Sequence, residues 1–248
     1  MMLLWRRTLV LLFLYSALAR DAYFYNRLHL IMAYIDIHTH FYTLGNDDVI
    51  SIENIYDHFE TIPKNHLIST GLHPWYLQDA ATQFSLLNNV AGESNVIAIG
   101  ECGLDKLTTT PWNVQVKCFE LQVQLAEQLH KPIIIHCVKA FAEVLPIVKG
   151  IKVPVIFHGI NNKISIIEPV IKRGYYLSFG KSLLNPSDLI QQTLLHVPLT
   201  QLFLETDDSN ASIKDIYKSA AEIRNISENE IALQLQKNYN AVFSYAGS

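Results

Sequence analysis

Short apolar runs alternate with longer amphipathic stretches from residue 34 to the end of the 248-residue chain. Several runs consist almost wholly of Val, Ile and Leu, as in strands that are buried on both faces of a parallel sheet. This alternation predicts a parallel α/β fold. Eight runs have the length and composition of strands: Tyr34–His40, Asp48–Asn54, His66–His73, Val96–Glu101, Pro132–His136, Val153–His158, Tyr175–Gly180 and Leu202–Asp207.

Eight strands are the number that closes a (β/α)8 barrel, which typically needs about 250 residues and sometimes nearer 200. We therefore predict that residues 34–248 form a single TIM barrel domain. The barrel is expected to be trimmed, because the link at residues 41–47 is too short to hold a helix. Pro146 and Pro169 should shorten or kink two later helices, since proline removes a backbone donor and crowds the preceding turn.

Residues 1–33 are predicted to be an N-terminal extension outside this domain. Trp5-Arg6-Arg7 precedes the apolar run Thr8–Ala19, which resembles a signal peptide but is shorter than the roughly 20 residues of a membrane-spanning helix. Two interpretations stay open: an incorrectly assigned start upstream of Met32, or a genuine signal peptide. The first predicts a cytoplasmic protein and the second an exported one, and neither gives the mature domain a membrane partner.

The composition is that of a folded domain with a sizeable core. Hydrophobic residues make up 50% of the chain and charged residues 17%, which argues against disorder. The formal net charge of −4 lacks the basic character of proteins that coat nucleic acid. The three cysteines, Cys102, Cys118 and Cys137, show no CxxC spacing, so we expect reduced thiols, with Cys102 and Cys137 in the core.

Metal-binding side chains stand at the ends of the predicted strands, where barrel enzymes carry their active sites. A single histidine after an apolar run is more often a packing residue than a ligand, and a lone HxH pair is a weak signal. Because metal-binding side chains occur together at five strand ends, we interpret them as metal ligands and not as packing residues. The predicted ligands are His38, His40, Glu101, His136, His158 and Asp207.

Six converging nitrogen and oxygen ligands are more than one ion normally takes from a protein, so the pattern predicts two divalent ions. Glu101, on a middle strand, is best placed to bridge them, and the pair would activate a shared water. Asp207 is expected to bind a metal and to accept the proton of that water as general base. Imidazole and carboxylate ligands suit Zn or Mn better than Mg, which remains an alternative.

These strings resemble the TatD family of metal-dependent hydrolases, the TatD-type deoxyribonucleases with an amidohydrolase-like barrel. The resemblance runs from about Tyr34 to Phe243. It implies the metal-ligand roles given above, with Glu101 and Asp207 at the catalytic centre, and places His73 beside the metals to contact a phosphate. It also implies hydrolysis of DNA from the 3′ end. The matching motifs are DxHxH at Asp36–His40, GxHP at Gly71–Pro74, GExGLD at Gly100–Asp105, HC at His136-Cys137, His158, and ETD at Glu205–Asp207.

The sequence departs from the family pattern at three places that would contact substrate: Val138, Ile160-Asn161-Asn162 and Asp208-Ser209-Asn210. The expected substrate is a DNA end or a small phosphodiester. The departures weaken this prediction, but they do not affect the prediction of hydrolysis. An alternative is a metal-dependent amide or ester hydrolase of the amidohydrolase type. Many of those bridge their metals with a modified lysine where this chain has Glu101. A third possibility, an inactive binding barrel, is disfavoured because no ligand is missing.

Overall fold

The computed structural model describes residues 33–42 and 48–243. The N-terminal extension lies outside the described residues, so both interpretations of it stay predictions. The link predicted to lack a helix, residues 41–47, is described only at Phe41 and Tyr42.

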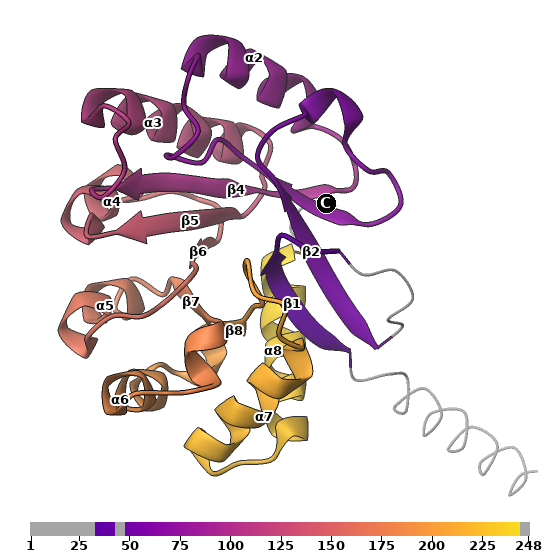
Figure 1. The fold of residues 1–248 in the computed structure, drawn as a ribbon, viewed down its shortest axis with the longest axis vertical. Coiled ribbons are helices and arrows are strands. Elements are labelled where there is room, and N and C mark those ends of the chain that lie inside the picture. Colours follow the sequence, from indigo (N-terminus) through magenta and orange to yellow (C-terminus); the bar gives the residue numbers. More distant parts are fainter. Residues whose placement is uncertain (1–32, 43–47, 244–248) are drawn as a thin grey trace, which may run out of the picture. The chain divides into compact units, whose positions relative to one another are not determined.

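Eight parallel strands form one sheet in which each strand pairs with the next along the chain (Figure 1). All eight predicted strands are present, with ends that differ from the predicted ones by up to four residues. The strands are β1 Tyr34–Thr39, β2 Val49–Ile55, β3 Leu67–Thr70, β4 Val96–Asp105, β5 Ile133–Val138, β6 Val155–Phe157, β7 Tyr176–Phe179 and β8 Leu202–Leu204.

The last strand returns to the first, which nearly closes the sheet into a barrel. A parallel bridge pairs Thr39 with Asp207, just beyond the end of β8. His40 N donates to Asp207 O at 3.0 Å, and Asp207 N donates to His38 O at 2.9 Å. The side chain of Thr206 adds a bond from its Oγ1 to Asp36 Oδ2 at 2.7 Å. The predicted (β/α)8 barrel is therefore confirmed.

Helices follow most strands and lie around the barrel (Figure 1). The described helices are α2 Ala80–Val90, α3 Trp112–Gln128, α4 Phe141–Ile147, α5 Ile164–Ile171, α6 Asp188–His196, α7 Ile213–Arg224 and α8 Glu228–Phe243, with short 3-10 turns η1 Phe59–Thr61, η2 Lys181–Leu183 and η3 Leu199–Gln201. The barrel is trimmed as predicted, since the fully described link between β2 and β3 holds only η1. Helices α4 and α5, which contain Pro146 and Pro169, have 7 and 8 residues.

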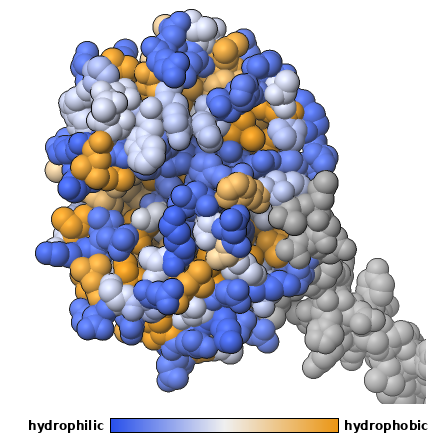
Figure 2. Space-filling view, in the orientation of Figure 1, coloured by the Kyte–Doolittle hydropathy of each residue, from blue (hydrophilic) through white to orange (hydrophobic). Residues whose placement is uncertain are grey.

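The hydrophobic core consists mainly of two clusters that join the strands to the surrounding helices. The larger hydrophobic cluster joins strand residues to the inner faces of α3, α6 and α7. A second cluster joins Ile35 and Ile37 of β1 to Phe203 of β8 and to Val242 and Phe243 at the end of α8. Hydrophobic and hydrophilic residues are interspersed on the face seen in Figure 2. No described helix combines the length and apolar character that crossing a membrane requires.

Candidate metal centre

The structure brings the six predicted ligands together at the carboxyl ends of the strands. Five of them border one cavity of about 600 Å³, and the sixth, His38, is fully buried against two of the others. This convergence is what the strand-end pattern predicts. The five that border the cavity are His40, Glu101, His136, His158 and Asp207.

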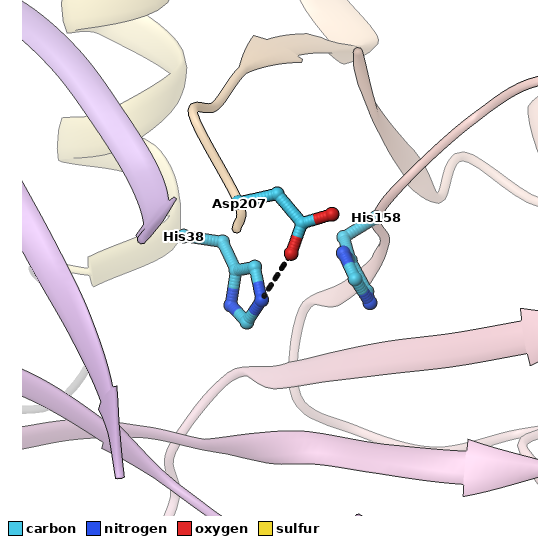
Figure 3. Close-up of side chains that lie close together, drawn as sticks. All are labelled: His38, His158 and Asp207. Carbon is cyan, nitrogen blue, oxygen red and sulfur yellow. Dashed lines mark ion pairs between the residues drawn. The ribbon is translucent and has the colours of Figure 1, made fainter. Parts of the chain in front are cut away.

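A first set of four ligand atoms forms a ring of nearly equal edges. His38 Nε2 lies 3.4 Å from Glu101 Oε2 and 3.6 Å from Asp207 Oδ1. His40 Nε2 lies 3.7 Å from that glutamate oxygen and 3.5 Å from that aspartate oxygen. Figure 3 shows the Asp207 carboxylate facing the His38 ring, with His158 on its other side.

A second set gathers at the other oxygen of the same glutamate. Glu101 Oε1 lies 2.7 Å from His136 Nδ1 and 2.7 Å from His158 Nε2. His73 Nε2 is 3.2 Å from this oxygen and 3.3 Å from His136 Nδ1. Each oxygen of Glu101 thus serves a different group of histidines. His73, which was expected to contact a phosphate, also lies close enough to Glu101 and His136 to form a possible ligand triad with them.

The first set fits a divalent metal ion better than it fits a hydrogen-bond network. Ligand atoms bound at about 2.1 Å from a tetrahedral ion lie about 3.4 Å from one another. Four of the six separations in the set, 3.4 to 3.7 Å, are close to that value and longer than ordinary hydrogen bonds, and the atoms of His38, His40 and Glu101 all lie within 4.8 Å of one another. His38 Nε2 is buried and has no partner in hydrogen-bonding geometry. A buried nitrogen of this kind is normally satisfied, and a cation would satisfy it.

The charges of the centre favour the ligating forms of its carboxylates. Burial opposes ionisation of Glu101, but His158, His136 and His38 outweigh it and hold the pKa of Glu101 well below its usual range. Burial likewise opposes ionisation of Asp207, yet the nearby imidazoles of His38 and His40 lower its pKa. Burial lowers the pKa of His73, which favours its neutral imidazole. Both carboxylates are therefore anionic at neutral pH.

Asp105 holds His136 in its orientation. Its Oδ2 accepts from His136 Nε2 at 2.9 Å and from the indole Nε1 of Trp75 at 2.6 Å. Its Oδ1 accepts from the Leu107 backbone at 2.7 Å. With Nε2 engaged as a donor, Nδ1 of His136 is left as the nitrogen that faces Glu101. Such outer carboxylates fix the tautomer and direction of metal-binding histidines.

Two further buried side chains support the other ligands. Glu205 Oε1 lies 3.5 Å from His158 Nδ1 and accepts from Gly159 N at 2.7 Å. Asn54, in β2, accepts from the backbone N of Glu101 through its Oδ1 at 2.7 Å. The backbone of Glu101 is thus tied to the neighbouring strand β2.

Close backbone packing explains two glycines of the β4 motif. A Cβ at Gly103 would lie 2.0 Å from the carbonyl oxygen of His136, and one at Gly100 would lie 2.4 Å from that of Ile134. Both glycines have positive φ, 148° and 142°, which disfavours other residues as well. Glycine here lets β4 approach β5 closely enough for Glu101 to reach His136.

Three other histidines, His58, His130 and His196, lie outside the centre. The His58 side chain is 78% exposed, His130 is exposed, and His196 pairs with Glu168 at 2.6 Å. One cysteine prediction is wrong. Cys102 is buried, but Cys137 is only partly buried and borders the cavity, because β5 ends there and its wall is open to the mouth.

The departures from the family pattern fall at two kinds of position. Val138 and Asp208 border the cavity, and Asp208 Oδ1 accepts from Lys181 Nζ at 2.5 Å. Asn161 and Asn162 are not among the lining residues, and the Asn162 carbonyl accepts from Thr193 Oγ1 at 2.9 Å. The departures at Val138 and Asp208 therefore bear directly on the cavity.

Sequence reasoning did not assign roles to Asp105, Glu205, Asn54 or Trp75. A signal was present for Asp105, since Glu101, Gly103 and Asp105 share one face of a strand with a period of two. Trp75 gave none, because its indole reaches Asp105 from the loop after β3, and that contact depends on how the loop folds.

The comparisons with known proteins agree with this geometry. The family model described as TatD related DNase matches residues 36–244. An uncharacterized metal-dependent hydrolase of Escherichia coli, YcfH, is 26% identical over 197 residues, which are 72% of this chain and 74% of the relative. The human 3′-5′ RNA nuclease TATDN2 is 32% identical over 160 residues, which are 60% of this chain and 21% of that protein.

Solved structures show the same fold. YjjV, a TatD homologue from Escherichia coli, superposes with a TM-score of 0.74 at 21% identity, covering 85% of this chain and 98% of that one. A TatD-family hydrolase from Entamoeba histolytica superposes with a TM-score of 0.69 at 15% identity, covering 86% and 98%. Since the family model spans most of the chain, this protein belongs to the TatD-related DNase family of metal-dependent hydrolases.

Proposed function

We propose that this protein hydrolyses phosphodiester bonds at the 3′ end of a nucleic-acid strand, using two divalent ions. The family is described by its DNase members, and one relative is named as a 3′-5′ RNA nuclease. The proposed ligands are His38, His40, Glu101, His136, His158 and Asp207.

The proposal rests on one observation: the two oxygens of Glu101 lie against different groups of histidines. Oε2 belongs to the ring with His38 and His40, and Oε1 lies against His136 and His158. A carboxylate with each oxygen in a separate nitrogen-rich group suits a bridge between two cations. When bound, two ions about 3.5–4 Å apart activate water and neutralise charge on the attacked phosphate.

The side chains then have separate tasks. Asp207 is anionic, and its side chain is 27% exposed at the cavity wall, so it is placed to accept a proton from the attacking water. His73, neutral and next to Glu101, is placed to contact a phosphate oxygen. Imidazole and carboxylate ligands favour Zn or Mn, with Mg as the alternative.

A second candidate function, hydrolysis of an amide or ester, is favoured by one observation. Among the residues that the structure describes, neither lysine nor arginine lines the cavity. A substrate without phosphate would not need either. The bridging glutamate argues for the phosphodiesterase, because many amidohydrolases use a modified lysine at that strand end.

The test is a substrate screen with metal-free protein to which Zn, Mn or Mg is added back. The substrates are a single-stranded oligonucleotide labelled at either end, bis-p-nitrophenyl phosphate, a p-nitrophenyl ester and an anilide. We expect metal-dependent hydrolysis of both phosphodiesters, with early release of the 3′ label. Hydrolysis of the ester or anilide alone would establish the second candidate, and inactivity on all four would refute both.

A further inference from the structure

Aromatic side chains gather on one wall of the cavity. Tyr56, Trp75 and Tyr76, which we call the aromatic wall, all border it. Trp75 is 54% exposed and Tyr76 43% exposed. Of the four strongly exposed aromatic side chains among the described residues, only Trp112 does not border the cavity. Exposed apolar surface collected in this way, beside a polar centre, marks a binding surface.

The aromatic wall is held in place before any ligand arrives. The rings of Tyr56 and Tyr76 are stacked, with centroids 4.9 Å apart and planes inclined by 19°. Trp75 donates from its indole to Asp105 at 2.6 Å, and its backbone N donates to His73 Nδ1 at 3.1 Å. Rings fixed in this manner lose little conformational entropy on binding, which favours affinity.

In the described part of the chain, neither lysine nor arginine lines the cavity, so neither pairs with a phosphate backbone there. The described lining contains five carboxylates: Glu53, Asp57, Glu101, Asp207 and Asp208. Lys181, which lies at the same side, is engaged by Asp208. Beyond the phosphate that the metal ions would hold, binding free energy must therefore come from the uncharged parts of the substrate.

The distance from the wall to the ligands suits one nucleotide. The Tyr56 ring centroid lies 5.8 Å from that of His40, and the Tyr76 centroid lies 5.4 Å from that of His73. A phosphate at the metal ligands would therefore carry its own or the adjacent base to the aromatic wall. Stacking on aromatic side chains tolerates every base, but needs a base that is not stacked within a duplex.

We propose that the aromatic wall is a stacking subsite for an unpaired nucleobase next to the scissile phosphate. The inference rests on the proposed function, and it names the substrate class as a single-stranded end. The wall selects for an unpaired base, and the metal ligands provide the chemistry.

Tyr76→Leu is the test variant because it keeps an apolar side chain and removes the ring. Tyr76→Phe keeps the ring and removes the hydroxyl. Trp75 is left intact, since it also holds Asp105. Trp112→Leu is the matched control, as an exposed aromatic residue away from the cavity. Melting temperatures of all variants establish that each is folded.

The binding probes are two hexathymidylates in which both bridging oxygens of every phosphate are replaced by methylene groups, which leaves no phosphodiester bond to hydrolyse. One carries all its bases, and the other has two abasic nucleotides at the 3′ end. Fluorescence anisotropy with Mn²⁺ present gives the dissociation constants. We expect Tyr76→Leu to weaken binding of the base-bearing probe by about 5- to 100-fold. The Phe variant and Trp112→Leu should stay within about twofold, as should every variant with the abasic probe.

Equal losses with both probes, or no loss with either, would overturn the stacking subsite. The same variants assayed on ordinary hexathymidylate separate this result from the proposed function. Ring-dependent binding without hydrolysis by the parent protein would uphold the subsite and refute phosphodiester hydrolysis. Hydrolysis that is indifferent to the ring and to the terminal bases would uphold the function and refute the subsite.

Discussion

Thr39 and Asp207 form the parallel bridge that joins the end of the last strand to the first. The same contact places the Asp207 carboxylate against His38 and His40, because the backbone bonds on both sides of the bridge involve those two histidines. Closure of the barrel and assembly of the first ligand set thus depend on the same contact, which we call the seam. A substitution that weakens the seam should therefore also weaken metal binding.

Thr206→Val tests this coupling. The Thr206 hydroxyl donates to Asp36 Oδ2 at 2.7 Å and lies 2.9 Å from Thr39 Oγ1, and all three side chains are buried. Leaving these groups unpaired should lower the free energy of unfolding by about 1–3 kcal/mol. We also expect a weaker affinity for Zn²⁺ or Mn²⁺, measured by calorimetric titration alongside denaturant unfolding.

Thr193→Val is the control for that variant. Thr193 is buried and its hydroxyl donates to Asn162 O and Leu189 O, but it lies on α6, away from the ligands. It should lose comparable stability and keep its metal affinity. If both valine variants lose affinity equally, the seam has no special connection with the metal centre.

Asp207→Asn should abolish most turnover while the fold survives. The amide keeps one acceptor oxygen but loses the charge and the ability to take a proton. Loss of a general base lowers the rate by about 10²–10⁴-fold. Metal-supported hydrolysis of an oligonucleotide gives the measurement. Asp188→Asn is the matched control, because that carboxylate lies in the first turn of α6 and is not among the residues that line the cavity. Near-native turnover in a folded Asp207→Asn protein would remove Asp207 from the mechanism.

Asp105→Asn should weaken one metal site more than the other. Two donors, His136 Nε2 and Trp75 Nε1, converge on Oδ2, and the Leu107 backbone donates to Oδ1. An amide NH2 would face a donor in either orientation. Loss of such an outer carboxylate typically costs about 10–100-fold in affinity or activity. Titration should show a single weakened binding step, and two unchanged steps would mean that Asp105 does not position His136.

Binding of single-stranded DNA should depend only weakly on salt. Each neutralised phosphate of a single strand contributes about −0.7 to the slope of log affinity against log salt concentration. Since neither lysine nor arginine lines the cavity, we expect a slope no steeper than about −1. Anisotropy titrations between about 50 and 200 mM NaCl at fixed Mn²⁺ measure it. A slope steeper than about −3 would reveal a cationic track outside the cavity.

Most of the fold and the set of candidate ligands could be predicted from the sequence, for a physical reason. Strands buried on both faces leave long apolar runs, and parallel strands present their carboxyl ends at one mouth. His136 and His158 were therefore recognisable as strand-end residues without knowing their neighbours. Trp75 and Glu205 were not, because they act through contacts across neighbouring strands and loops that no local pattern encodes.

The aromatic wall was also invisible in the sequence. Tyr56 and Tyr76 are twenty positions apart, and only the folding of the loops after β2 and β3 stacks their rings.

The number of metal ions bound per chain tests the account most directly. Protein saturated with Zn²⁺ or Mn²⁺ is freed of loose metal by gel filtration and analysed by native mass spectrometry. We predict two ions per chain for the parent protein and fewer than one for Glu101→Gln, because both sites share that carboxylate. Glu53→Gln, at a cavity carboxylate paired with His66, should retain two. A parent protein holding at most one ion, or a Glu101→Gln protein holding two, would contradict the bridged centre.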